Sequence, residues 1–190
     1  IGLALLIRTG VVQAFYIPSG SMEDTLLVGD YLLANKFIYG APIDVPLTNI
    51  SLFRLPAIRD PEPGDIVIFR SPVDEDRDLI KRCVAIGGQE IRIVNKVLYI
   101  NGEPFRDPPL AKYVDRTFYP AMANPRDNFG PYTVPADHFF MMGDNRDNSR
   151  DSRFPGVSFI PENRLVGKAV RIWMSWQGGP VWDRIGKGIH

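Results

Sequence analysis

The chain has 190 residues, 45% of them hydrophobic, which is enough for one substantial core with room for an inserted subdomain. Its formal net charge is zero and its Lys and Arg residues are scattered, so no basic stripe exists to neutralise phosphates, and we expect no nucleic-acid partner. The single cysteine, Cys83, excludes an internal disulfide, and the two histidines form no paired-His pattern, so we expect no metal and no cofactor.

The chain begins with a short apolar stretch, Ile1 to Ile7, followed by Arg8. Seven residues are too few to span a bilayer, which takes about 20. We interpret residues 1–10 as the tail of a truncated N-terminal membrane segment. An ordinary N-terminal helix or strand is the alternative.

Short apolar runs bounded by turn residues follow along the chain, and they predict strands over 11–17, 30–36, 65–70, 79–86, 90–100, 139–142 and 166–176. A turn leading into a short helix is expected over 19–25. Residues 40–63 are rich in proline and residues 103–135 in Pro, Asn and Asp, so we expect loops in both. Because there is no βαβ rhythm, these elements predict a mostly-β fold.

Three segments have compositions suited to chemistry. The first is Pro18-Ser19-Gly20-Ser21-Met22, directly after a predicted strand. Glycine allows a sharp turn, so a serine here can present its hydroxyl and its own N–H to one point. By itself, an ordinary loop is the commoner explanation of such a triplet.

The second segment contains Lys81 inside an apolar β run, Leu79 to Ile86. A serine nucleophile needs a base, and His138 is the only internal histidine. A lysine can serve instead if burial lowers its pKa, because desolvation disfavours the ammonium. The ordinary alternative is a lysine whose head reaches solvent.

The third segment, Gly143 to Arg153, alternates Asp, Asn, Arg and Ser directly after a hydrophobic strand. Alternating charges favour a folded network of charge-assisted hydrogen bonds over a solvated loop. The spacing is also similar to a calcium loop, but Arg146 and Arg150 would place cations inside it.

Together these segments resemble the bacterial type I signal peptidases, also called leader peptidases. Ser19 to Leu26 is similar to the nucleophile box of that family, and Gly29 to Gly40 to the box that follows it. Pro63 to Phe69 with Ile80-Lys81-Arg82 is similar to the lysine box, and Gly143 to Arg153 to the signature near the C-terminal end. The four motifs occur in family order. The family usually has proline where Asp24 stands.

The resemblance implies an antiparallel, barrel-like β core with a smaller inserted β subdomain. We assign residues 11–89 and 137–190 to the catalytic core and residues 90–136 to the insert. It also implies a membrane-associated monomeric serine endopeptidase that removes signal peptides from exported preproteins after Ala-x-Ala, on the periplasmic side of the bacterial cytoplasmic membrane.

Site roles also follow from the resemblance. Ser21 is the implied nucleophile and Lys81 the general base, while Ser19 helps to bind the oxyanion and Ser149 orients Lys81. The implied supporting network is Asp144, Arg146, Asp151 and Arg153. The implied substrate-binding residues are Phe15, Ile17, Pro18, Met22, Leu26, Leu32, Ile68, Asp78, Leu79 and Ile80.

Three tryptophans, Trp173, Trp176 and Trp182, lie near the C-terminal end. Aromatic side chains suit a bilayer interface, so a lipid surface is one expected partner, and a packed core is the alternative.

Two other functions fit parts of the sequence. A self-cleaving repressor of the LexA type also uses a Ser–Lys pair, although the Gly143 to Arg153 motif argues against it. A non-catalytic peptide-binding β module would keep the strands but would need no lysine in an apolar run. Among signal peptidases, mitochondrial and plastid relatives are further possibilities.

Overall fold

A computed structural model describes residues 12–40, 42–44, 51–54 and 56–190. Its regular structure is strand, with two single 3₁₀ turns, η1 (Gly20–Met22) and η2 (Glu162–Arg164), and no α-helix in those ranges. In the same ranges, no helix has the length and apolarity needed to cross a membrane. The membrane segment predicted at residues 1–10 lies outside the described residues.

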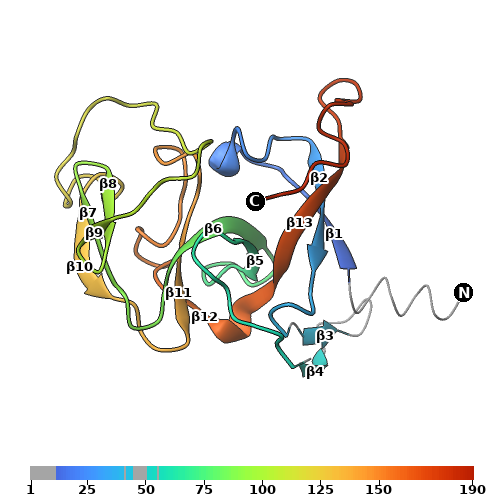
Figure 1. The fold of residues 1–190 in the computed structure, drawn as a ribbon, viewed down its shortest axis with the longest axis horizontal. Helices are drawn as coiled ribbons and strands as arrows, with labels where there is room; N and C mark the ends of the chain where they lie inside the picture. Colours follow the sequence, from blue (N-terminus) through green and yellow to red (C-terminus); the bar gives the residue numbers. More distant parts are fainter. Residues whose placement is uncertain (1–11, 41, 45–50, 55) are drawn as a thin grey trace, which may run out of the picture.

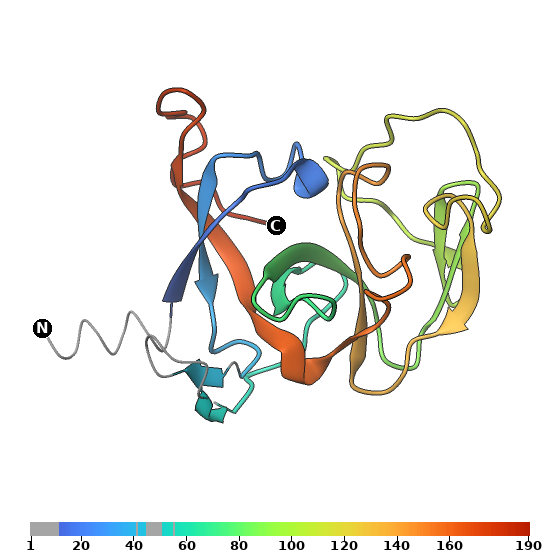
Figure 2. The ribbon, with the colours of Figure 1, turned by 180° about the vertical axis from the view of Figure 1, so that it is seen from behind.

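The main element is a curled antiparallel sheet of seven strands (Figures 1 and 2). In spatial order its strands are β1 (Val12–Tyr16), β2 (Asp30–Asn35), β13 (Leu165–Ser175), β5 (Ile66–Arg70), β6 (Asp78–Ile86), β11 (His138–Met142) and β12 (Ile160–Pro161). Sequence neighbours such as β5 and β6 pair directly, whereas β13 returns from the end of the chain to lie between β2 and β5.

The burial of each strand follows from its place in this sheet. β2 alternates, with Leu32 and Ala34 fully buried, as expected for a strand with one face on the core. β5 lies between β13 and β6, and Ile66 to Phe69 are all buried. β6 is buried from Lys81 to Ala85. Lys81 therefore lies in a buried stretch of β6 and is surrounded by core side chains instead of solvent.

A second sheet packs beside the first and contains β10 (Phe129–Thr133), β7 (Glu90–Val94), β8 (Val97–Ile100) and β9 (Glu103–Pro104) in spatial order. All four strands fall within the range predicted for the insert. A two-stranded hairpin, β3 (Pro42–Asp44) and β4 (Ser51–Arg54), completes the fold. The predicted mostly-β fold class, with one large antiparallel sheet and one smaller sheet, is confirmed.

Several element boundaries differ from the sequence prediction. The single run predicted over 90–100 is a hairpin, because Asn95 and Lys96 take positive φ values of 47° and 70° and turn the chain. β10 lies in a segment predicted as loops. Its sequence contains Gly and Pro, and it becomes a strand by pairing with β7 and packing Phe129 on Phe140, with ring centroids 5.2 Å apart. The β3–β4 hairpin was likewise predicted as irregular.

Candidate active site

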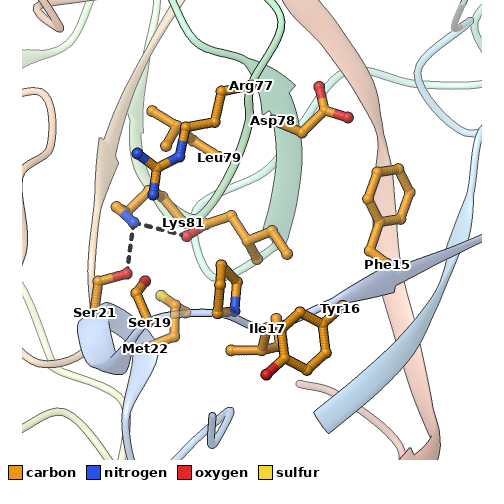
Figure 3. A pocket seen from close by; sticks show the side chains of 12 residues that line it. Phe15, Tyr16, Ile17, Ser19, Ser21, Met22, Arg77, Asp78, Leu79 and Lys81 are labelled. Carbon is orange, nitrogen blue, oxygen red and sulfur yellow. Dashed lines mark hydrogen bonds between the residues drawn. The ribbon is translucent and has the colours of Figure 1, made fainter. Parts of the chain in front are cut away.

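Two strand segments face one another with free edges. β1 is the last strand of the large sheet and pairs only with β2 among the described strands. At the start of β6, Asp78 to Lys81 pair with β5, but the pairing of β6 with β11 begins at Arg82. A cleft of about 160 Å³ lies between these segments (Figure 3). An extended peptide could therefore pair with both edges.

The Ser19–Met22 turn follows β1 and places Ser21 at one end of the cleft. The chain forms the 3₁₀ turn η1, which the Glu23 N–H closes on the Gly20 carbonyl at 3.1 Å. Met22 is buried and anchors the turn in the core. Ser19 precedes the turn in extended conformation and makes no capping hydrogen bond, so its hydroxyl remains available at the cleft.

Lys81 comes from the opposite side of the cleft and contacts Ser21 directly. Its Nζ donates to Ser21 Oγ at 2.7 Å and to the Ile80 carbonyl at 3.0 Å (Figure 3). The side chain is almost entirely buried, at 4% exposure. The alternative of a lysine that reaches solvent is therefore wrong.

Burial lowers the pKa of Lys81 from its ordinary 10.5 to about 8. The carboxylates of Asp151 and Asp144 oppose this change, and the guanidiniums of Arg77 and Arg153 assist it. Desolvation dominates because the ammonium loses its water without gaining a directly paired carboxylate. A substantial neutral fraction of Lys81 consequently exists near neutral pH, as a general base requires.

The Gly143–Arg153 loop holds the serine turn through its backbone. Asn145 donates its N–H to the Ser21 carbonyl at 3.1 Å, and its side-chain amide donates to Glu23 Oε2 at 3.0 Å. Both atoms lie on the nucleophile turn, so the loop fixes where Ser21 sits. Asn145 was not among the residues predicted for the site, because a backbone N–H contact has no signature in residue type.

Asp144 connects the same loop to β6. It accepts a bidentate pair from Arg82, with Nε–Oδ1 at 2.8 Å and Nη2–Oδ2 at 2.7 Å, and a hydrogen bond from Thr25 Oγ1 at 2.6 Å. Arg82 directly follows Lys81 in β6. The buried carboxylate of Asp144 thus joins its own loop to β6 and to the segment that follows Ser21.

Asp151 and Arg153 form a second buried bidentate pair, with both N–O distances at 2.8 Å. Burial alone would raise the pKa of Asp151, but the Arg153 guanidinium holds that pKa below its ordinary value. Arg153 also donates to the Arg146 carbonyl at 2.7 Å. Arg146 itself is buried and pairs with Asp107 at 2.6 Å, so it links the loop to the segment between β9 and β10.

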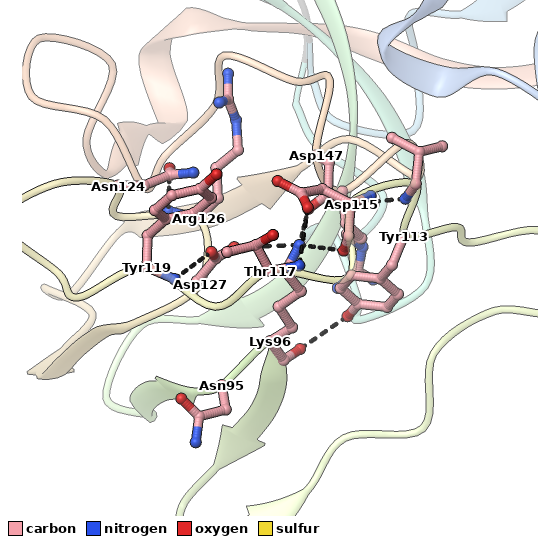
Figure 4. Close-up of polar contacts among 12 residues, drawn as sticks. Asn95, Lys96, Tyr113, Asp115, Thr117, Tyr119, Asn124, Arg126, Asp127 and Asp147 are labelled. Atoms are coloured by element: carbon pink, nitrogen blue, oxygen red, sulfur yellow. Dashed lines mark hydrogen bonds and ion pairs between the residues drawn. The ribbon is translucent and has the colours of Figure 1, made fainter.

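The turn of the second sheet also supports this loop (Figure 4). Lys96, at the β7–β8 turn, donates to Asp147 Oδ1 at 2.7 Å and to the Asp115 carbonyl at 2.7 Å. Asp147 Oδ2 accepts the N–H groups of Val114 and Asp115, each at 2.8 Å. The second sheet is thereby connected to the polar loop beside Ser21.

Ser149 is buried beside Gly143, and its Oγ makes no hydrogen bond to Lys81 in this structure. Its side chain instead faces Asp151 and, by hydrogen bonding, helps to lower the pKa of that carboxyl. Its predicted role in orienting Lys81 therefore stays a prediction. A Cβ on Gly143 would collide with Ser149 Oγ and the Ser21 carbonyl, so only glycine fits there.

The predicted substrate-binding residues divide into two groups. Those that line the cleft are Phe15, Ile17, Pro18, Met22, Asp78, Leu79 and Ile80. Leu26, Leu32 and Ile68 are fully buried in the core cluster that supports Ile17 and Met22, and they do not line the cleft. Tyr16 and Arg77 also line the cleft and were not named among the predicted substrate-binding residues. No group of metal-ligating side chains occurs among the described residues.

Comparison with known proteins finds relatives of this chain. The sequence profile described as "Signal peptidase, peptidase S26" matches residues 1–175. Signal peptidase I of Pseudomonas fluorescens is 37% identical over 205 residues, covering 92% of this chain and 69% of that protein. Signal peptidase I of Pseudomonas aeruginosa is 36% identical over 200 residues, with the same two shares. A crystal structure of a signal peptidase I from Enterococcus faecalis V583 superposes with a TM-score of 0.47 at 25% identity, covering 59% of this chain and 98% of that one.

The mostly-β fold, the cleft with its serine, and the sequence matches define a serine peptidase. The chain belongs to the signal peptidase family, peptidase S26.

Proposed function

We propose that this protein cleaves signal peptides from exported preproteins after Ala-x-Ala, with Ser21 as nucleophile and Lys81 as general base. The observation that carries the proposal is the 2.7 Å contact of Lys81 Nζ with Ser21 Oγ, made by a buried lysine whose pKa is lowered to about 8. A peptide-binding module would gain nothing from burying a lysine against a serine, since the charge costs stability.

The chemistry follows in two halves. Neutral Lys81 takes the Ser21 proton as Oγ attacks the scissile carbonyl, and the resulting ammonium then protonates the leaving amine. The product of this half is an ester between Ser21 and the signal peptide. Lys81, neutral again, removes a proton from water, the water oxygen attacks the ester, and Ser21 recovers its proton from Lys81.

The oxyanion needs donors on the other side of the carbonyl. The first N–H groups of a 3₁₀ turn have no partner inside the turn, so the Ser21 N–H can donate to a ligand. The Ser19 hydroxyl, which makes no capping bond, is the second donor. Each donor is worth about 3 kcal/mol in the transition state. Ser149, which is buried beside Gly143, would orient Lys81 through its hydroxyl.

Cleavage after small residues is supported by the size of the cleft. At about 160 Å³ and walled by Met22, Leu79 and Ile80, it has room for small side chains beside Ser21. Two pockets are proposed, with partly shared walls. The residue before the cut would lie among Ile17, Met22, Leu26, Leu79 and Ile80, and the residue at −3 among Phe15, Leu32, Ile68 and Ile80. Leu26, Leu32 and Ile68 would act from behind, by supporting the residues that line the cleft.

A membrane location is part of the same proposal. Trp173, Trp176 and Trp182 are exposed at 43%, 55% and 76%, which excludes a packed core as the reason for all three. Tyr31 packs edge-on against Trp173, with ring centroids 6.0 Å apart, and extends this aromatic surface towards β1. Exposed tryptophans suit the headgroup region, on the outer face of the bacterial cytoplasmic membrane. The protein would act there as a monomer. Co-sedimentation with liposomes, lost in a variant with all three tryptophans changed to Ser, tests this location.

The decisive experiment compares wild type, Ser21→Ala and Lys81→Ala on a preprotein, with the cut site mapped by mass spectrometry. We expect cleavage only by wild type, directly after Ala-x-Ala, and unchanged circular dichroism in both variants. Normal cleavage by either variant would refute the Ser–Lys assignment. Equal cleavage of peptides with Ala or Leu at −1 would refute the pocket assignment.

A further inference from the structure

A second cavity, of about 300 Å³, lies beyond the Ser–Lys pair. It shares Ser19, Ser21, Arg77, Leu79 and Lys81 with the first cleft, so the two cavities meet at the position of the scissile bond. One wall is the β5–β6 connection, which contributes Ser71, Val73 and Asp74. The other is the polar loop, which contributes Asn148 and Arg150, together with Val157.

Two arginines that line this cavity, Arg77 and Arg150, have guanidiniums that the described part of the fold leaves without a partner. Within the described residues, Arg77 and Arg150 have no carboxylate at ion-pair distance and their guanidiniums make no hydrogen bond. Six other arginines are paired with carboxylates, namely Arg59, Arg82, Arg146, Arg153, Arg164 and Arg184. Arg92, Arg106 and Arg116 also have no carboxylate partner among the described residues, but they do not line this cavity. The guanidinium is built to bind carboxylates in bidentate geometry, so two unpaired ones in one cavity indicate an acidic ligand.

The position of Arg77 strengthens this indication. The Ser71 N–H donates to the Arg77 carbonyl at 2.8 Å, and the Arg77 N–H donates to the Asp74 carbonyl at 3.1 Å. These two hydrogen bonds fix the backbone of Arg77 directly before β6. Figure 3 shows the Arg77 side chain above Leu79, with its guanidinium on the side of Lys81. The cation is near enough to act on the Lys81 ammonium. The one carboxylate that lines the cavity, Asp74, accepts a hydrogen bond from the Asp76 N–H at 3.3 Å.

The first cleft determines which part of a substrate reaches this cavity. It runs beside Phe15 to Pro18 and Asp78 to Ile80, where the residues before the cut would add as a strand. The residues after the cut must leave Ser21 on the other side. We propose that the second cavity binds an acidic side chain at position +1 or +2 of the substrate, through Arg77 and Arg150. This inference rests on the proposed function and specifies its substrates further: preproteins whose mature part begins with an acidic residue.

The test uses matched peptides that share an Ala-x-Ala sequence and carry Glu, Gln or Lys at −2, +1 or +2. For wild type at low salt we expect kcat/KM about fivefold higher with Glu than with Gln at +1 or +2, with Lys poorest, and a smaller ratio at high salt. The double variant Arg77→Glu, Arg150→Glu should invert the order to favour Lys. Arg92→Ala removes an exposed arginine on β7, away from both cavities, and should leave the ratio unchanged.

Equal rates with Glu and Gln at both positions would overturn the proposal, as would a Glu preference that survives the double charge reversal. A preference confined to −2 would overturn the assignment to the mature side. The inactive Ser21→Ala variant separates this proposal from the proposed function. Its affinities for the Glu and Gln peptides, measured by fluorescence anisotropy, report on the arginines even if wild type cleaves none of the peptides.

Discussion

At the scale of single residues, Lys81 combines an energetic cost with a chemical benefit. A buried ammonium without a directly paired carboxylate destabilises the folded state, and the drop of its pKa to about 8 measures that cost. The same drop provides a neutral amine in contact with Ser21. Stability and reactivity are therefore opposed at this position.

Lys81→Met should abolish cleavage and stabilise the protein. The pKa of Lys81 is lower in the folded than in the unfolded chain, so the unfolded chain binds more protons between about pH 8 and 10.5. The stability of wild type therefore rises with pH in this window, while that of the Met variant does not. The excess of the variant's free energy of unfolding over that of wild type should shrink by about 2 kcal/mol between pH 7 and pH 9.5. Urea unfolding at the two pH values measures it, and a constant difference would mean that Lys81 is not desolvated.

At the scale of elements, the nucleophile turn is held from several sides. Asn145 binds the Ser21 carbonyl, and Lys112, from the segment between β9 and β10, pairs with Glu23 and Asp24 at 3.1 Å each. Lys112 also donates its N–H to the Asp144 carbonyl at 2.9 Å. Lys112 therefore holds both the serine turn and the polar loop. Asp24 ends the turn with φ of +76°, in the left-handed region.

Asp24→Pro should lose stability and activity, although the family usually has proline at this position. Proline fixes φ near −65°, so it cannot adopt +76° without rearranging the turn that carries Ser21. We expect a loss of about 3 kcal/mol in the free energy of unfolding, with a matching loss of cleavage. Asp24→Gly is the control, because glycine accepts this φ and loses only a half-exposed ion pair. A proline variant as stable as wild type would show that the turn readily takes another conformation.

At the scale of the whole molecule, one carboxylate ties distant segments together. Asp65, directly before β5, accepts a hydrogen bond from Tyr39 Oη at 2.7 Å and pairs with Arg59 at 2.8 Å and Lys168 at 2.5 Å. Lys168 lies on β13, so this cluster joins segments about 100 residues apart in the chain. Burial alone would raise the pKa of Asp65, but its two cations and the tyrosine hydroxyl hold that pKa well below its ordinary value.

Asp65→Asn should reduce the free energy of unfolding by about 3 kcal/mol near neutral pH, because it leaves the two cations without their carboxylate. The folded pKa of Asp65 is depressed, so its stabilisation is present above the unfolded pKa of about 3.9 and is lost as pH falls through the folded pKa. The difference in free energy of unfolding between wild type and the Asn variant should thus become smaller below about pH 4. Urea titrations across this range test it. Asp183→Asn, at an exposed carboxylate, should have little effect at any pH.

The sequence by itself determined the fold class and most strands of the large sheet, because short apolar runs between turn residues report directly on burial. It could not determine the split of 90–100 into a hairpin or the strand at 129–133. The first depends on two non-glycine residues with positive φ, and the second on pairing with β7. Neither feature produces a recognisable hydrophobic pattern in the sequence.

For the site, the sequence indicated Ser21 and Lys81 only in combination, and tertiary structure brought their atoms to 2.7 Å. Whether Lys81 was buried depended on the sheet around β6, since an apolar run does not show which way a lysine head points. The partners of Asp144 and Asn145 were likewise decided by tertiary structure. Residue types state which bonds a side chain can make, but its actual partners depend on which segments, distant in sequence, the fold brings within about 3 Å.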